Sequence, residues 1–115
     1  MEKICILGAG SWGTAQALLL SKNCRQIFLW GRPEEGLDDF IAARENKRYL
    51  PGASIPDNVS ITVDLETAVK DAGMVVLAVP SQSVRGILGK LKPLLLKEMY
   101  LVNTAKGLEL DTFMR

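Results

Sequence analysis

Three glycines near the start of the chain have a spacing that suits phosphate binding. Gly8, Gly10 and Gly13 form the pattern G-x-G-x-x-G between an apolar run at Lys3–Leu7 and a helix-like run at Ser11–Lys22. In this position Gly8 allows a tight turn after a strand, Gly10 lets a pyrophosphate approach the backbone, and Gly13 lets the helix pack closely on the sheet. The helix N-terminus then offers free N–H groups and positive partial charge to phosphates. The strand-to-helix context, rather than the letters alone, distinguishes this pattern from a glycine-rich turn that binds nothing.

The residues after the second predicted strand bear on the choice of dinucleotide. When NAD is bound, a carboxylate is expected there to hold the ribose 2′-hydroxyl. The segment LWGRPEE instead places Arg32 nineteen residues after Gly13. An arginine at this point can make a forked, charge-assisted contact with the 2′-phosphate of NADP. Glu34 and Glu35 follow and could still serve a 2′-hydroxyl, and Arg32 could be an ordinary surface charge. The pattern favours NADP, with NAD also accepted.

Alternating strands and helices must position these residues. Further strands are predicted at Gln26–Trp30, Ser60–Val63, Met74–Val79 and Tyr100–Asn103. Further helices are predicted at Leu37–Arg44, from the cap Asp64 to Ala72, and at Gln82–Leu91 after the cap Ser81. A loop is predicted at Tyr49–Asn58. This alternation predicts an α/β fold, a doubly wound, Rossmann-type parallel sheet with strand order 3-2-1-4-5, in one domain over residues 1–115.

That topology predicts which segments meet at the ligand. Ligands of such sheets bind beyond the carboxyl ends of the strands, where the strand order reverses. Three segments follow strands that end there: Gly8–Gly13, Val79–Gln82 with Pro80, and Asn103–Gly107. Lys106 would then be a cation at the lip of the crevice, able to bind a phosphate or polarise a carbonyl. The alternative is an ordinary surface lysine.

Composition excludes several other functions. The net charge of +1 gives no reason to expect nucleic acid or an anionic membrane as a partner. No apolar run has the length of a membrane span, and the N-terminus does not have the pattern of a signal peptide, so we expect a cytoplasmic location. The chain has no histidine, which removes a histidine base or ligand. Its two cysteines, Cys5 and Cys24, are expected to be reduced, and no cluster suggests a metal site.

Several segments together resemble one enzyme family. Four segments are similar to segments of the bacterial-type NAD(P)-dependent glycerol-3-phosphate dehydrogenases: GAGSWGTA, ENKRYLPG, DLETAVKDAGMVVLAVPSQ and VNTAKGLE. The resemblance implies reduction of dihydroxyacetone phosphate to sn-glycerol 3-phosphate, the entry to phospholipid synthesis. It also implies that Ser11, Trp12, Arg32 and Tyr49 contact the cofactor, and that Lys106 contacts both cofactor and substrate phosphate. For Trp12, packing in the core is the alternative.

The resemblance also implies a second domain. Family members continue well beyond the length of this chain into a helical domain, which carries the catalytic lysine and most substrate contacts. We therefore expect this chain to supply the cofactor-binding half, to hold no catalytic residue itself and to be inactive alone. An apolar patch near the last strand, with a homodimer formed through it, is a further expectation.

Two other functions fit parts of the pattern. A ketopantoate-type reductase would share the glycine loop and the strand order, but the ENxxYLPG segment argues against it. A non-catalytic NAD(P)-sensing module would fit the length, but would not require Lys106 or the VPSQ and AKG segments. The fold alone cannot separate an enzyme from a sensor.

Overall fold

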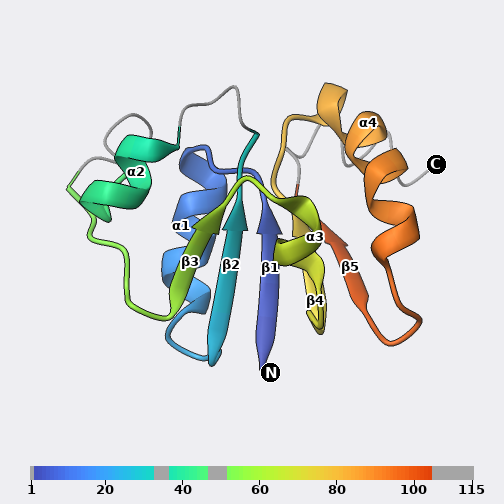
Figure 1. Cartoon of the computed structure of the whole chain (residues 1–115), viewed down its shortest axis with the longest axis horizontal. Helices are drawn as coiled ribbons and strands as arrows, with labels where there is room; N and C mark the ends of the chain where they lie inside the picture. Colours follow the sequence, from blue (N-terminus) through green and yellow to red (C-terminus); the bar gives the residue numbers. More distant parts are fainter. Residues whose placement is uncertain (1, 33–36, 47–51, 105–115) are drawn as a thin grey trace.

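A computed structural model describes residues 2–32, 37–46 and 52–104. Five parallel strands form one sheet in the order β3-β2-β1-β4-β5 (Figure 1). The strands are β1 (Lys3–Leu7), β2 (Gln26–Trp30), β3 (Val59–Thr62), β4 (Met74–Leu77) and β5 (Tyr100–Asn103). The helices are α1 (Ser11–Leu20), α2 (Asp38–Ala43), α3 (Leu65–Val69), α4 (Ser81–Leu91) and the short 3₁₀ helix η2 (Lys92–Leu94). The predicted fold class and strand order are confirmed.

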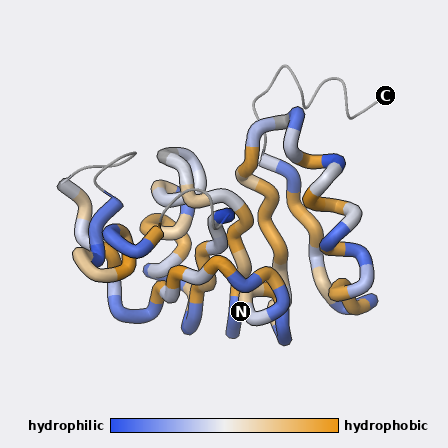
Figure 2. Tube along the Cα trace, turned by 45° about the horizontal axis from the view of Figure 1, so that its top comes forward, coloured by the Kyte–Doolittle hydropathy of each residue, from blue (hydrophilic) through white to orange (hydrophobic). Residues whose placement is uncertain are grey.

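The central strand β1 explains why the apolar runs are continuous. It pairs with β2 on one side and β4 on the other, so that Ile6 lies opposite both Leu29 and Val76. Alternate residues of β1 enter different cores: Ile6 packs in the core under α1 and α2, and Cys5 packs in the core under α3 and α4. Both faces of this strand are therefore buried, as parallel sheets require. Figure 2 shows hydrophobic residues along the middle strands and alternating hydropathy along α4.

Two predicted boundaries are wrong by small amounts for identifiable reasons. The third strand is Val59–Thr62 rather than Ser60–Val63, since Val59 is buried while Val63 is exposed and accepts a hydrogen bond from the indole N–H of Trp30 through its carbonyl. The fourth strand ends at Leu77 rather than Val79. There the carbonyl of Leu77 accepts bonds from both the backbone N–H and the hydroxyl of Thr104.

The helix ends also differ from the prediction. Pro80, not Ser81, is the N-cap of α4, because Pro80 has an extended ψ of 149° and its carbonyl accepts the N–H of Ser83. The first and second helices end at Leu20 and Ala43, within two residues of the predicted ends.

The third helix ends at Val69 rather than Ala72 because the chain turns at Asp71, whose φ is 62°. The ammonium of Lys3 donates to two carbonyls at this end, those of Thr67 and Lys70. The predicted cap at the other end is confirmed, because the side chain of Asp64 accepts the N–H of Glu66. These bonds confine α3 to little more than one turn.

An apolar strip is exposed next to the last strand, as predicted. Tyr100, Leu101 and Val102 of β5 are 67%, 45% and 36% exposed. β5 lies at the edge of the described sheet, and Trp12 and Leu19 of α1 are also exposed. Whether a second copy of the chain covers this strip stays a prediction. Among the described residues, no helix combines the length and the apolar character that crossing a membrane would take.

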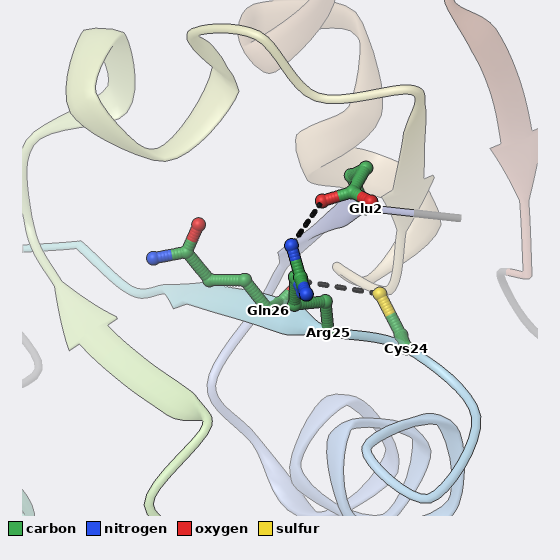
Figure 3. A network of polar contacts seen from close by, with 4 residues as sticks. All are labelled: Glu2, Cys24, Arg25 and Gln26. Carbon is green, nitrogen blue, oxygen red and sulfur yellow. Dashed lines mark hydrogen bonds and ion pairs between the residues drawn. The ribbon is translucent and has the colours of Figure 1, made fainter.

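Polar contacts close the amino edge of the sheet around Cys24 (Figure 3). The thiol of Cys24 donates to the carbonyl of Gln26 at 3.2 Å, and Arg25 pairs with Glu2 at 3.4 Å. Both charged side chains of this ion pair are 80% exposed, so the pair adds little to stability. Cys24 and Cys5 are both free thiols, as expected.

We predict that the Cys5 thiol is unreactive in the folded protein. Desolvation in the core raises its pKa to about 12, so almost no thiolate forms near neutral pH. In a Cys24→Ser variant, which keeps a donor for the Gln26 carbonyl, alkylation of Cys5 at pH 8 should proceed only as fast as the protein unfolds. Alkylation that is fast in buffer and insensitive to denaturant would contradict this placement of Cys5.

Candidate cofactor site

Two of the three motif glycines are required by the fold itself. Gly8 has a φ of +128°, and a Cβ there would lie 2.7 Å from the carbonyl oxygen of Ala78. A Cβ on Gly13 would overlap the carbonyl oxygen of Gly8. The chain therefore turns sharply out of β1 against the end of β4, and α1 starts directly over that turn. The predicted roles of Gly8 in the turn and of Gly13 in close packing are confirmed in this geometry.

Gly10 differs from both because the protein does not need it to be glycine. Its φ of −76° and ψ of −168° suit any residue, and a Cβ there would meet no atom of the described residues within 4 Å. Gly10 is the N-cap of α1, and the first turn of that helix contains no acidic residue. The first N–H groups of a helix have no acceptor within it, and they carry positive partial charge. The loop thus presents backbone donors beside a space that none of the described residues fills.

The first turn of α1 reaches the end of β5 through Trp12. Its indole N–H donates to the carbonyl of Thr104 at 2.9 Å. The ring is 56% exposed, so the alternative that Trp12 packs in the core is wrong. The hydroxyl of Thr104 bonds in turn to the carbonyl of Leu77 at 3.0 Å. The glycine loop, β4 and β5 are therefore joined at one edge, close to the backbone of Ser11.

The end of β2 reaches the same loop through Gly31. A Cβ on Gly31 would lie 2.9 Å from both Ala9 in the glycine loop and Leu37 before α2. Its N–H donates to the carbonyl of Thr62 at 3.1 Å. The next residue is Arg32, which is exposed at this edge of the sheet. Glu34 and Glu35, the alternative ribose ligands, lie outside the described residues.

The segment after β4 completes the predicted crevice. Ala78 contacts Gly8, Val79 is buried, and Pro80 is exposed at the start of α4. The glycine loop, the VPSQ segment and the end of β5 therefore share one edge, as the topology predicts. Tyr49 and Lys106 lie outside the described residues, so their contacts with cofactor or substrate stay predictions. Within the parts of the chain that the structure describes, no three potential metal ligands come together.

The sequence reasoning missed a buried polar residue that touches the glycine loop. The side-chain amide of Asn46 donates to the carbonyl of Ala9 at 2.8 Å and to the hydroxyl of Thr14 at 2.9 Å. Asn46 is only 4% exposed. It belongs to the ENKRYLPG segment, which pointed to a family resemblance but did not indicate that Asn46 contacts the glycine loop. Buried polar side chains need such partners, but the sequence does not show that Asn46 is buried, so it gave no signal of this contact.

Comparison with known proteins agrees with this geometry. A family model described as the N-terminus of NAD-dependent glycerol-3-phosphate dehydrogenase matches residues 3–115. The glycerol-3-phosphate dehydrogenase (NAD(P)+) of Syntrophomonas wolfei is 57% identical over 115 residues, which are 100% of this chain and 34% of the relative. The corresponding enzyme of Carboxydothermus hydrogenoformans is 49% identical over 113 residues, 98% of this chain and 34% of that one.

A solved structure is similar over the same region. The crystal structure of glycerol-3-phosphate dehydrogenase from Coxiella burnetii matches with a TM-score of 0.86 and 32% identity, over 92% of this chain and 33% of that one. The chain thus spans about a third of the length of the relatives it matches. The matched region is the one that the family model describes as the N-terminus. This chain belongs to the NAD-dependent glycerol-3-phosphate dehydrogenase family and corresponds to the N-terminal part of its members.

Proposed function

We propose that this chain binds the pyrophosphate of NAD(P) on its glycine loop. The observation that carries the proposal is Gly10, which has no positive φ and, among the described residues, no neighbour that excludes a side chain. A glycine that the fold does not need is explained by a ligand that approaches the backbone there. The adjoining N-terminus of α1 supplies donors to an anion, with no acidic side chain in its first turn to compete.

We further propose that the cofactor is preferentially NADP, with NAD also bound. Arg32 supports this choice, because it is exposed one residue after Gly31, which packs against Ala9 of the glycine loop. A ribose that extends from the loop toward β2 would bring its 2′-substituent to this edge. A guanidinium stabilises a phosphate far more than a hydroxyl, since its fork matches two phosphate oxygens.

For the whole protein we propose reduction of dihydroxyacetone phosphate to sn-glycerol 3-phosphate, in the service of glycerophospholipid synthesis. A hydride moves from NAD(P)H to the carbonyl carbon, and a proton is delivered to the carbonyl oxygen. This chain would hold the cofactor, and Lys106 would contact the cofactor and the substrate phosphate. The proton donor is expected in the region that corresponds to the remaining two thirds of the relatives. A cytoplasmic location and a homodimer stay predictions.

The first prediction from the proposed function separates ligand binding from folding at the glycines. Gly10→Ala should change the free energy of unfolding by no more than about 1 kcal/mol, the scale of an N-cap substitution. It should nevertheless weaken NADPH binding at least about tenfold, equivalent to ~1.4 kcal/mol, because its methyl group would occupy the space of a phosphate oxygen. Calorimetric titration and thermal unfolding measure the two effects.

Two further glycines serve as controls for this experiment. Gly86→Ala in α4, where a Cβ also meets none of the residues that the structure describes within 4 Å, should leave binding unchanged. Gly13→Ala should instead destabilise the fold by about 3 kcal/mol or more, because its methyl group overlaps backbone. Normal NADPH affinity in a folded Gly10→Ala protein would remove the observation on which the proposed function rests.

The second prediction concerns cofactor preference. Arg32→Ala should weaken NADPH binding by about ten- to a hundredfold, the loss expected for charge-assisted bonds. NADH binding should change little, because NADH has no 2′-phosphate. Arg25→Ala is the matched control, since Arg25 is an exposed arginine at the opposite, amino edge of the sheet. Equal loss of NADH and NADPH affinity in Arg32→Ala would show that Arg32 does not read the 2′-phosphate.

The third prediction tests the whole reaction. In the Syntrophomonas wolfei enzyme, the matched N-terminal region can be replaced by this chain, which is 57% identical to it. The chimera should oxidise NADPH only when dihydroxyacetone phosphate is present, and the isolated chain should not. A folded chimera without activity, combined with a cofactor-dependent change of oligomeric state in the isolated chain, would favour the sensing module instead.

A further inference from the structure

A buried triangle of hydrogen bonds joins the glycine loop to a distant segment. Asn46 Nδ2 donates to the carbonyl oxygen of Ala9 at 2.8 Å and to Thr14 Oγ1 at 2.9 Å. Thr14 Oγ1 donates to the same carbonyl at 3.4 Å. These three residues are 4%, 1% and 0% exposed, in the order Asn46, Ala9 and Thr14. The Ala9 carbonyl therefore receives two donors in a place that water does not reach.

The contact sets the orientation of the peptide plane between Ala9 and Gly10. The described chain contains no cis peptide bond, so the N–H of Gly10 points opposite to the carbonyl of Ala9. Because that carbonyl is directed inward to Asn46, the Gly10 N–H is directed away from Asn46. The helix start is fixed as well, since the N–H of Thr14 donates to the carbonyl of Gly10 at 3.0 Å.

Asn46 can hold this orientation because its own segment is anchored elsewhere. The carbonyl of Arg44, two residues before Asn46, accepts the N–H of Ile55 at 2.7 Å. The carboxylate of Glu45 accepts the N–H of Gly52 at 2.9 Å. The guanidinium of Arg44 also donates to the carbonyls of Pro56, before β3, and of Val59, the first residue of β3. The side chain thus extends from a braced loop rather than from the glycine turn that it contacts.

We propose that Asn46 is a positioning residue for the cofactor phosphates. Its amide holds the Ala9 carbonyl inward, which keeps the Gly10 N–H turned toward the pyrophosphate site; this role in binding rests on the proposed function. Without the amide, the peptide plane samples other orientations, and only part of the population can bind. The apparent dissociation constant rises in inverse proportion to that part.

The chain offers a matched control at the other end of α1. Asn58 Nδ2 donates to the carbonyls of Ser21 at 2.8 Å and Cys24 at 3.0 Å. Like Asn46, it is an asparagine whose side-chain amide donates to the backbone beside one end of α1, here beyond the C-terminal end. It lies at the amino edge of the sheet, before β3, while the glycine loop lies at the carboxyl edge. Its loss should cost stability without disturbing the loop.

The experiment compares Asn46→Asp and Asn46→Ala with Asn58→Asp. The aspartates keep the shape of asparagine, but an ionised carboxylate only accepts hydrogen bonds and cannot hold a carbonyl. We expect both Asn46 variants to bind NADPH about tenfold or more weakly at a temperature where all the proteins are folded, as when only a tenth of the molecules keep the competent loop. Asn58→Asp should keep its affinity within about twofold, even if its melting temperature falls equally.

A second readout does not depend on cofactor. Amide hydrogen exchange at Thr14, whose N–H bonds to Gly10, should become faster in the Asn46 variants and stay unchanged in Asn58→Asp. Normal exchange at Thr14 in the Asn46 variants would overturn the proposal, and so would wild-type NADPH affinity in either of them. If the unmodified chain binds no NADPH, the proposed function fails, while exchange still shows whether Asn46 orders the loop.

Discussion

The close approach of Gly13 to the carbonyl of Gly8 is the constraint on which the rest of the structure depends. It forces α1 to begin directly over the turn that leaves β1. Because β1 is the central strand and is buried on both faces, that turn has a fixed place between β2 and β4. The end of β4 then closes on the turn from the other side, at Ala78. The glycine loop is consequently held in place by the core.

Contacts from three further segments also hold this loop. Gly31 after β2 packs on Ala9, Trp12 bonds to Thr104 after β5, and Asn46 after α2 bonds to the Ala9 carbonyl. Each contact involves backbone atoms or a side chain with few rotatable bonds. Each therefore fixes the position of the loop as well as adding stability. A site whose groups are held before the ligand arrives loses less entropy on binding.

Much of the fold could be predicted from the sequence because its signals are local. Continuous apolar runs such as Lys3–Leu7 show strands covered on both faces, and the bounds of β1, β2 and β5 match the prediction. The errors occur where either of two residues could mark the end of a helix or strand. Val59 and Val63 flank the third strand equally well, and Pro80 and Ser81 can each start a helix. A tertiary contact from Trp30 to the Val63 carbonyl accompanies the first outcome, and a local backbone bond from Ser83 to the Pro80 carbonyl accompanies the second.

The candidate site was predictable only in part, for a related reason. The turn and packing roles of Gly8 and Gly13 follow from their place between a strand and a helix. The role of Asn46 does not, because its partner Ala9 is 37 residues away and no periodic pattern connects them. Gly31 was likewise hidden, since a lone glycine after a strand does not reveal what approaches it. Long-range contacts to a motif have no local signature.

The placement of the indole rings has an optical consequence. The chain has two tryptophans, and they occupy opposite environments. Trp30 is buried beside the core under α3 and α4, whereas Trp12 is 56% exposed on the first turn of α1. Fluorescence from Trp30 reports whether the core is intact. Fluorescence from Trp12 reports changes in the surroundings of the glycine loop. Single replacements by phenylalanine would separate the two signals, so that one unlabelled molecule carries its own probes of folding and occupancy.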